Sequence, residues 1–296
     1  MVGLGRMGGN MARRLMQAGH EVVAYDVAPE AVEALAREGA AAASHLKELV
    51  DQLDGPRVVW LMLPAGEITQ GAVDDLMTLL RPGDVVVDGG NSRHLDSVQR
   101  AASLFTRGIS FVDVGTSGGV WGLEEGYCLM IGADEEEFAR LEPVFSALAP
   151  ADGYARVGPP GAGHYVKMVH NAIEYSLMQS YAEGFELMKA SDYRLDAAQV
   201  ANVWRHGSVI RSWLLDLAAE ALGSDPELAE LGERVSDSGE GRWTLQESID
   251  AGIPMPGLAA ALFARFDTQR ESSYGARLMA ALRREFGGHA VEKADE

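Results

Sequence analysis

The chain has 296 residues, enough for one large domain or two modest domains with a sizeable hydrophobic core. Its 25 basic and 44 acidic residues give a net charge of −19, which argues against nucleic acid and anionic membrane surfaces as partners. A small anion held by a local group of arginines remains compatible with this charge. The single cysteine, Cys128, excludes an intrachain disulfide and a cysteine metal cluster. No apolar run approaches the roughly 18 residues that span a membrane and no signal peptide precedes the first motif, so we expect a soluble, cytoplasmic protein.

Short apolar runs alternate with helical stretches in the first half of the chain. The apolar runs predict strands over 22–26, 57–63, 84–88, 111–114 and 127–132. Between them the residue pattern predicts helices over 8–18, 29–38, 45–53, 67–80, 92–106 and 135–148. Several of these are continuous runs of the Val, Ile and Leu type, which is typical of strands buried on both faces of a parallel sheet. The alternation predicts a Rossmann-like, doubly wound α/β sheet.

A stretch rich in Gly and Pro, VGPPGAG at 157–163, ends this alternation. After it we find no convincing strand pattern, and helical periodicity covers 164–190, 196–220, 244–250 and 257–285. We therefore expect a dinucleotide-binding Rossmann domain over 1–160 and an all-helical domain over 161–296.

The first residues contain a nucleotide-binding pattern. The chain opens with MVGLGRMGGNMARRLMQAGHEVVAYD, in which Gly3, Gly5 and Gly8 fit G-x-G-x-x-G. In this pattern the first glycine allows a tight turn, the second lets backbone approach a pyrophosphate, and the third lets the next helix pack closely. Only two residues precede Gly3, whereas strands usually have about four to six residues. A few natural N-terminal residues missing from the numbered sequence would explain the short start.

Asp26 is the candidate ribose ligand. It lies 23 residues after Gly3, where an acidic residue binds the adenosine ribose hydroxyls. A carboxylate repels a 2′-phosphate, and Val27 and Ala28 offer no arginine to bind one, so we expect NAD rather than NADP. Alternatively, Asp26 only caps the helix predicted to begin at Pro29.

A polar stripe occupies the helix that follows the glycine-rich break. In KMVHNAIEY (167–175), a rotation of about 100° per residue puts five polar side chains on one face: Lys167, His170, Asn171, Glu174 and Tyr175. One interpretation is an ordinary solvated face. The other is a reaction site, because lysine, histidine and glutamate are the residue types that transfer protons. The residue types and the nearby domain boundary favour the second interpretation.

Together with GAGH at 161–164, KMVHNAIEY closely resembles the 6-phosphogluconate dehydrogenases, which decarboxylate their substrate to ribulose 5-phosphate in the pentose phosphate pathway. Further matching stretches, in the family's order, are GLGRMGGNMA (3–12), DGGNS (88–92), SGG (117–119), EGRWT (240–244), ARF (264–266) and RREFGGH (283–289). The chain resembles the short form, since many members carry a duplicated helical region. The resemblance implies a metal-free oxidoreductase whose helical domain binds substrate and forms at least a homodimer.

The resemblance also implies residue roles. Lys167 would be the general base at the C3 hydroxyl, and Glu174 the acid that protonates C1 after carbon dioxide leaves. The cofactor would contact Gly3, Gly5, Arg6, Met7, Gly8, Asp26, Leu63, Pro64 and Asn91. The sugar acid and its carboxylate would contact Asn91, Ser117, Gly118, Gly119, His170 and Asn171. The phosphate would contact Tyr175, Arg242 and Arg265, and a neighbouring subunit would add Arg283 and His289 from its C-terminal tail.

Two of these assignments carry alternatives. Arg242 stands where many members have lysine, so its contact with the phosphate differs in geometry. Arg283 and Arg284 are adjacent, and the sequence does not decide which of them is the ligand.

Two other functions compete with this one. The first is a sister 3-hydroxyacid dehydrogenase acting on hydroxyisobutyrate or tartronate semialdehyde, which would share the fingerprint, the SGG stretch and the lysine. A small unphosphorylated acid, however, needs neither a proton donor at C1 nor late arginines. The second is a non-catalytic NAD-binding protein on the same fold, which the fold alone does not exclude.

Overall fold

The computed structural model describes residues 1–288 and 290 of the chain. Contacts divide it into two compact units, Met1–Asn171 and Ala172–Glu296, and each is described by itself. The division falls inside the helix α8 (Ala162–Lys189), whose first turns belong to unit 1.

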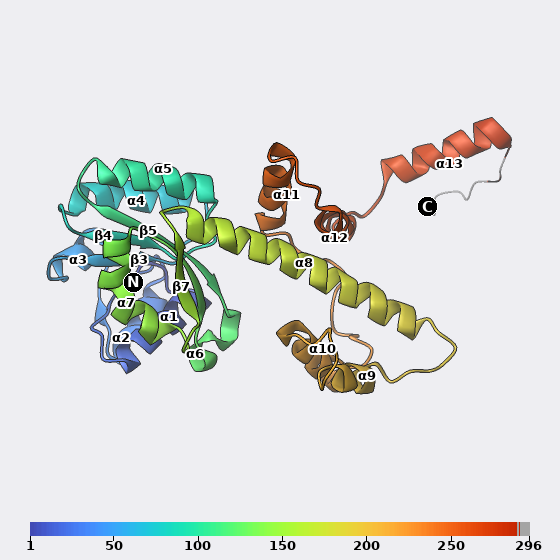
Figure 1. The fold of residues 1–296 in the computed structure, drawn as a ribbon, viewed down its shortest axis with the longest axis horizontal. Helices are drawn as coiled ribbons and strands as arrows, with labels where there is room; N and C mark the ends of the chain where they lie inside the picture. The colour runs from blue at the N-terminus through green and yellow to red at the C-terminus, as the bar shows by residue number, and fades with distance from the viewer. Residues whose placement is uncertain (289, 291–296) are drawn as a thin grey trace. The chain divides into compact units, whose positions relative to one another are not determined.

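Unit 1 is built on parallel strands with helices between them (Figure 1). Its strands are β1 (Val23–Ala24), β2 (Ala41–Ala42), β3 (Val58–Leu61), β4 (Val85–Asp88), β5 (Ser110–Ser117), β6 (Cys128–Gly132) and β7 (Tyr154–Gly158). Its helices before α8 are α1 (Arg6–Gln17), α2 (Pro29–Arg37), α3 (Leu46–Asp51), α4 (Glu67–Leu79), α5 (His94–Phe105), η1 (Gly119–Trp121), α6 (Gly122–Glu125) and α7 (Glu135–Leu148).

The strands form a two-stranded sheet, β1-β2, and a five-stranded sheet in the order β3-β4-β5-β6-β7. Val2 bridges Tyr25 on one side and Leu61 on the other, both in parallel register, and so links the two sheets. The strand that the fingerprint requires is therefore present as a short bridge between β1 and β3. This places Gly3 directly at the carboxyl end of a central strand position.

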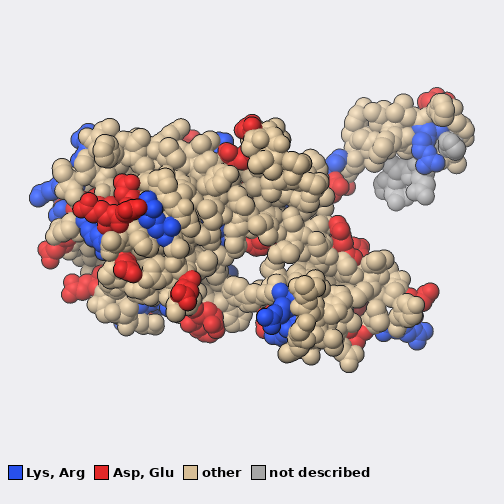
Figure 2. All heavy atoms as spheres, viewed as in Figure 1, with Lys and Arg blue, Asp and Glu red and all other residues tan. Residues whose placement is uncertain are grey.

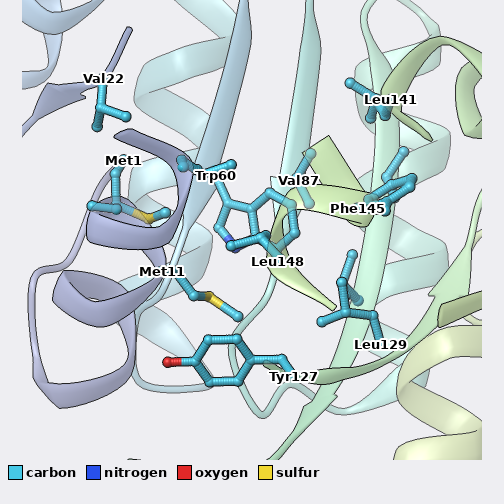
Figure 3. Packing of buried hydrophobic residues seen from close by; sticks show 14 of the residues in the cluster. Met1, Met11, Val22, Trp60, Val87, Tyr127, Leu129, Leu141, Phe145 and Leu148 are labelled. Carbon is cyan, nitrogen blue, oxygen red and sulfur yellow. The ribbon is translucent and has the colours of Figure 1, made fainter. Parts of the chain in front are cut away.

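Alternation along the strands builds a core on each face of the sheet. Trp60, Val87 and Val112 belong to one cluster, together with side chains of α1, α2 and α7, and Figure 3 shows part of it. Val59 and Val86 belong to the second cluster, with side chains of α3, α4 and α5. Because both faces are covered, the central strands read as continuous apolar runs. The doubly wound fold predicted from the sequence is confirmed.

One strand direction differs from the expected parallel sheet. β6 pairs with β5 in antiparallel register, and β7 then runs parallel to β6. A parallel crossover needs a dozen or more residues, and the segment between Ser117 and Cys128 is shorter and contains only η1 and α6. The chain therefore turns back beside β5. Strand β7, which the sequence analysis did not predict, is a short strand with partly exposed side chains at the end of the sheet.

The regular secondary structure of unit 2 is all helical within its described residues. It holds the rest of α8, then α9 (Ala197–Trp204), α10 (Trp213–Ser224), α11 (Glu240–Asp250), α12 (Pro256–Asp267) and α13 (Tyr274–Gly287). The stretches 196–220 and 257–285, predicted to be helical, each correspond to two helices with non-helical residues between them. Ser212 caps the start of α10, where its side chain accepts a hydrogen bond from the Leu215 N–H. Ser273 caps the start of α13, where its side chain accepts a hydrogen bond from the Ala276 N–H.

Figure 2 shows charged side chains in small groups on the visible face, with uncharged surface between them. No helix among the described residues is both long enough and apolar enough to cross a bilayer.

Candidate active site

The fingerprint glycines of unit 1 fit a dinucleotide. Gly3 has φ +87°, and a Cβ there would lie 2.4 Å from the Met62 carbonyl oxygen. A Cβ on Gly8 would lie 2.1 Å from the Gly3 carbonyl oxygen, so helix α1 approaches the turn as closely as backbone allows. A Cβ on Gly5 would meet open space, and no side chain among the described residues caps α1. The first N–H groups of α1, beginning at Arg6 and Met7, are therefore available to a pyrophosphate.

Asp26 is held in place by two backbone hydrogen bonds. Its Oδ2 accepts the Leu4 N–H at 2.5 Å and its Oδ1 accepts the Ala28 N–H at 2.9 Å. The carboxylate thus connects the fingerprint loop to the end of β1, and each oxygen keeps a lone pair for a ribose hydroxyl. Val27 beside it is 87% exposed and carries no charge. The capping interpretation accounts only for the contact with Ala28, whereas the contact with Leu4 couples Asp26 to the nucleotide loop.

The loops after β3 and β4 pack against each other. Leu63 and Pro64 follow β3, and a Cβ on Gly90 would lie 2.6 Å from the Leu63 carbonyl oxygen. Asn91 is the exposed next residue. The predicted cofactor contacts from these two loops are therefore neighbours.

A buried ion pair that the sequence analysis missed supports these loops. Asp88, at the end of β4, receives a hydrogen bond of 2.9 Å from Arg100 Nη1 and one of 2.7 Å from the Ser92 hydroxyl. Arg100 Nε also donates to Gln70 of α4 at 3.1 Å. Asp88 and Arg100 are 0% and 1% exposed at the side chain, so the pair is shielded from solvent. A single arginine in an amphipathic helix gave no signal for this role.

The SGG stretch ends β5. Ser117 is its last residue, and Gly118 and Gly119 have φ +122° and +53°, conformations that favour glycine. The turn therefore requires its glycines, and it follows the strand that contacts the start of α8.

The polar stripe of α8 is not an ordinary solvated face. Lys167 is 7% exposed and Asn171 is 8% exposed, whereas Ile173 on the apolar side is 55% exposed. His170 Nδ1 lies 3.0 Å from Asn171 Oδ1. Lys167 and Glu174 lie on the same continuous helix, about 10.5 Å apart along its axis.

In unit 2 the structure brings together the residues expected to bind phosphate. The Arg265 guanidinium lies 3.6 Å from the centroid of the Tyr175 ring and donates to the Ser236 carbonyl at 3.0 Å. The Tyr175 hydroxyl lies 3.0 Å from the Ser238 hydroxyl. Arg242 forms an ion pair with Asp237 of the same loop and stacks on Phe266. The loop 235–239 therefore organises all three side chains.

The tail residues are placed only in part. Arg283 lies on α13 and is exposed, whereas Arg284 forms an ion pair with Glu285 at 2.9 Å. His289 lies outside the described residues. Among those that are described, no group of three or more His, Cys, Asp and Glu side chains is placed to hold a metal ion.

The fold and the fingerprint define a dinucleotide-binding protein of the Rossmann class with a helical second part. The chain belongs to the 6-phosphogluconate dehydrogenase family. The model for the NAD binding domain of 6-phosphogluconate dehydrogenase matches residues 1–158. The model for the 6-phosphogluconate dehydrogenase C-terminal domain matches residues 163–273.

Individual relatives agree with this membership. An NAD(+)-dependent, decarboxylating 6-phosphogluconate dehydrogenase of Haloferax volcanii is 44% identical over 300 residues, covering 100% of this chain and 99% of the relative. The solved 6-phosphogluconate dehydrogenase of Plasmodium falciparum superposes with a TM-score of 0.83 at 25% identity, covering all of this chain and 66% of that one. The 3-hydroxyisobutyrate dehydrogenase of Mycobacterium tuberculosis gives a TM-score of 0.74 at 25% identity, with 90% and 91% coverage.

The geometry at Asp26 yields a prediction on cofactor choice. Replacing Asp26 with Asn and Val27 with Arg removes the carboxylate and adds a guanidinium at an exposed position, so preference should move toward NADP by about tenfold or more. Steady-state kcat/KM with each cofactor measures this. The unaltered protein should prefer NAD, and a higher kcat/KM with NADP in that protein would refute the role of Asp26.

Proposed function

We propose that this protein oxidises and decarboxylates 6-phosphogluconate to ribulose 5-phosphate and carbon dioxide with NAD as the oxidant. The observation that carries the proposal is the buried Lys167 of the NAD-binding unit, on the same helix as Glu174, in a chain of this family. The paired Tyr175 and Arg265 provide the means of binding a phosphate, which a small unphosphorylated hydroxyacid would not use.

Lys167 is assigned the proton transfer at C3. Its neutral amine accepts the proton of the C3 hydroxyl while NAD, when bound, accepts the hydride from the same carbon. The product is a β-keto acid, in which the C3 ketone is an electron sink for the departing carboxylate. The lysine, now an ammonium, donates a hydrogen bond to that ketone and favours loss of carbon dioxide. The ammonium transfers its proton to the C3 oxygen as carbon dioxide leaves, which gives an enediol. Glu174 then protonates the carbon that carried the carboxylate, which is C2 of 6-phosphogluconate and C1 of ribulose 5-phosphate, and Lys167 takes back the enediol O–H proton.

The remaining side chains bind and orient the substrate. Asn91, Ser117, Gly118, Gly119, His170 and Asn171 are assigned to the sugar acid and its carboxylate. Tyr175, Arg242 and Arg265 are assigned to the phosphate, since a guanidinium binds phosphate through two parallel N–H groups. Arg242 already pairs with Asp237, so phosphate binding would exchange or share that partner.

The second part of the proposal is that the active unit is at least a homodimer whose tail reaches the partner's site. Helix α13 has no buried residue, and its stripe of Leu278, Leu282 and Phe286, at spacings of four, is 47%, 58% and 95% exposed. Figure 2 shows mostly uncharged surface on the visible side of this helix. Exposed apolar faces of this kind mark interaction sites. A second copy of the chain is the partner that the resemblance implies.

Unit 2 also offers an apolar groove. It has a volume of about 380 Å³ and is lined by side chains of α8 and of the segment that starts α12, among them Ile173, Leu177, Met255 and Leu258. Together with α13, it gives the chain two apolar surfaces for self-association.

The catalytic assignment predicts the behaviour of two variants. The unaltered protein should form reduced cofactor and carbon dioxide in equal amounts from 6-phosphogluconate and NAD. Lys167→Met should lower kcat for this reaction by about 10²- to 10⁴-fold, the usual contribution of a general base. Glu174→Gln should slow the protonation half, so that the first turnover of reduced cofactor outpaces the steady state.

Absorbance of the reduced cofactor and trapping of carbon dioxide measure these effects. Glu186→Gln, at an exposed position of the same helix, is the matched control and should leave kcat unchanged. Near-normal turnover by Lys167→Met would overturn the assignment. Absence of turnover by the unaltered protein, with efficient oxidation of 3-hydroxyisobutyrate, would favour the sister activity, and absence of both would favour a non-catalytic NAD-binding protein.

The shared tail predicts a difference between adjacent arginines. Arg283→Ala should raise KM for 6-phosphogluconate by about tenfold or more, the loss of one charge-assisted contact, without changing NAD binding. Arg284→Ala should change little, because that side chain pairs with Glu285. Steady-state kinetics of both variants measure the effect.

Deletion of residues 283–296 should have the same effect in a stronger form. Mixing that protein with full-length Lys167→Met should restore some activity, because a mixed dimer joins an intact lysine to an intact tail. If the truncated protein keeps the native KM, or if mixed dimers form without any recovery, the shared site is wrong.

A further inference from the structure

The first turns of α8 lie directly on the backbone of β5 and β6. A Cβ on Gly163 would lie 2.4 Å from the Met130 carbonyl oxygen and 2.6 Å from the Asp113 carbonyl oxygen. A Cβ on Gly132 would lie 2.8 Å from the Gly163 nitrogen. Real Cβ atoms essentially never lie this close to another atom, so this approach of helix and strands requires glycine at these positions. We call Gly115, Gly132 and Gly163 the glycine seat.

The glycine seat reaches the catalytic lysine itself. A Cβ on Gly115 would lie 2.4 Å from Lys167 Cβ and 2.6 Å from the Gly163 carbonyl oxygen. Lys167 follows the start of α8 by five residues, about 7.5 Å along the axis. The strand backbone at Gly115 therefore defines where the lysine side chain begins.

A buried carboxylate fixes the start of the same helix. Asp113 of β5 is 0% exposed, and its Oδ1 accepts the Gly161 N–H at 2.5 Å while its Oδ2 accepts the His164 N–H at 2.7 Å. The first N–H groups of a helix have no partner within it, and a neighbouring side chain usually caps them. Here the cap comes from a strand far away in sequence, because Asp113 lies 48 residues before Gly161 and 51 residues before His164.

The surroundings of Asp113 are consistent with a positional role. Burial raises the pKa of the Asp113 carboxyl, and the charge of a protonated His164 and the two backbone N–H groups oppose that shift. His164 Nδ1 lies 2.7 Å from the Ser97 hydroxyl of α5, so the start of α8 is also connected to that helix. A buried carboxylate is costly unless it is hydrogen-bonded. The two hydrogen bonds of Asp113 satisfy this requirement and fix the position of the start of α8 along strand β5.

We propose that Asp113 and Gly115 are positioning residues, which hold the first two turns of α8 on β5 and thereby place the Lys167 amine for proton transfer at C3. The proposal rests on the function assigned above. It adds that the geometry of the base is set by backbone contacts and a long-range helix cap, within unit 1.

Two variants with matched controls test the proposal. Gly115→Ala adds one methyl group where a Cβ would meet Lys167, and Asp113→Asn leaves one of the two helix N–H groups without an acceptor. Both should lower kcat by about 10- to 100-fold, the usual consequence of a displacement of about 1 Å in a reacting group. The controls are Gly71→Ala and Asp75→Asn, both at exposed positions of α4, and should keep the native kcat.

Two further readouts separate positioning from a general structural role. The affinity for NAD should stay within about twofold of the native value in both variants, because the fingerprint loops are unchanged. One of the two backbone N–H groups, that of Gly161 or that of His164, should exchange with deuterium about tenfold faster in Asp113→Asn, since it loses its hydrogen bond to the carboxylate. This exchange does not depend on activity.

The possible outcomes are distinct. Reduced kcat with native NAD affinity supports the proposal. Native kcat in both variants overturns it, and so does a loss of NAD affinity or folding in both, because the contacts would then support the whole of unit 1. If the unaltered protein does not turn over 6-phosphogluconate, the proposed function fails, and deuterium exchange alone then decides whether Asp113 caps α8.

Discussion

The close contact between the start of α8 and strand β5 is the constraint on which the rest of this structure depends. Nothing larger than glycine fits at Gly115 and Gly163, because each lies against backbone of the opposite element. Strand β5 lies beside β4 in the sheet that carries the loops holding Leu63 and Asn91. Lys167, the proposed base, is therefore attached to the same sheet as the loops with the predicted cofactor contacts. A rigid frame is what a hydride transfer and a proton transfer at one carbon require.

The loops with the predicted cofactor and substrate contacts share one edge of that sheet. The fingerprint follows Val2, Leu63 follows β3, Asn91 follows β4 and Gly118 follows β5. The carboxyl ends of parallel strands meet at the same edge, which is where ligands bind in open α/β sheets. The buried pair of Asp88 and Arg100 keeps two of these loops in place. The candidate site in unit 1 is thus supported by a charge pair that is shielded from solvent.

The proposed phosphate site of unit 2 follows a different principle. The chain carries a net charge of −19, yet Arg242 and Arg265 gather at one loop. Each guanidinium is oriented by an aromatic ring, Phe266 or Tyr175, and by an acceptor of the loop 235–239. Planar stacking limits the freedom of these long side chains before any anion binds. A local arrangement of this kind explains how an acidic protein can bind an acidic substrate.

Sequence patterns predicted those parts of the fold that depend on local geometry. Continuous Val and Leu runs identified the central strands, and three glycines with Asp26 identified the nucleotide loop, because both depend on local geometry. The reversal at β6 and the breaks after α9 and α12 were missed, since they depend on loop length and on single serine caps. The spacing of the polar stripe around Lys167 did not distinguish a solvated face from a packed site, and only the residue types and the nearby domain boundary favoured a site. Asp113 did leave a signal, as a lone acid within an apolar strand, but its partner is distant in sequence.

The central claim is that Lys167, held on β5 through the start of α8, faces C3 of 6-phosphogluconate. A crystal structure with NAD and 6-phosphogluconate bound measures this directly, through the distance between Lys167 Nζ and the C3 hydroxyl oxygen. We expect a hydrogen bond of about 2.7–3.2 Å, with the phosphate against Tyr175 and Arg265. A substrate bound with its C3 hydroxyl out of reach of Lys167, or with its phosphate away from both of those side chains, would contradict the account.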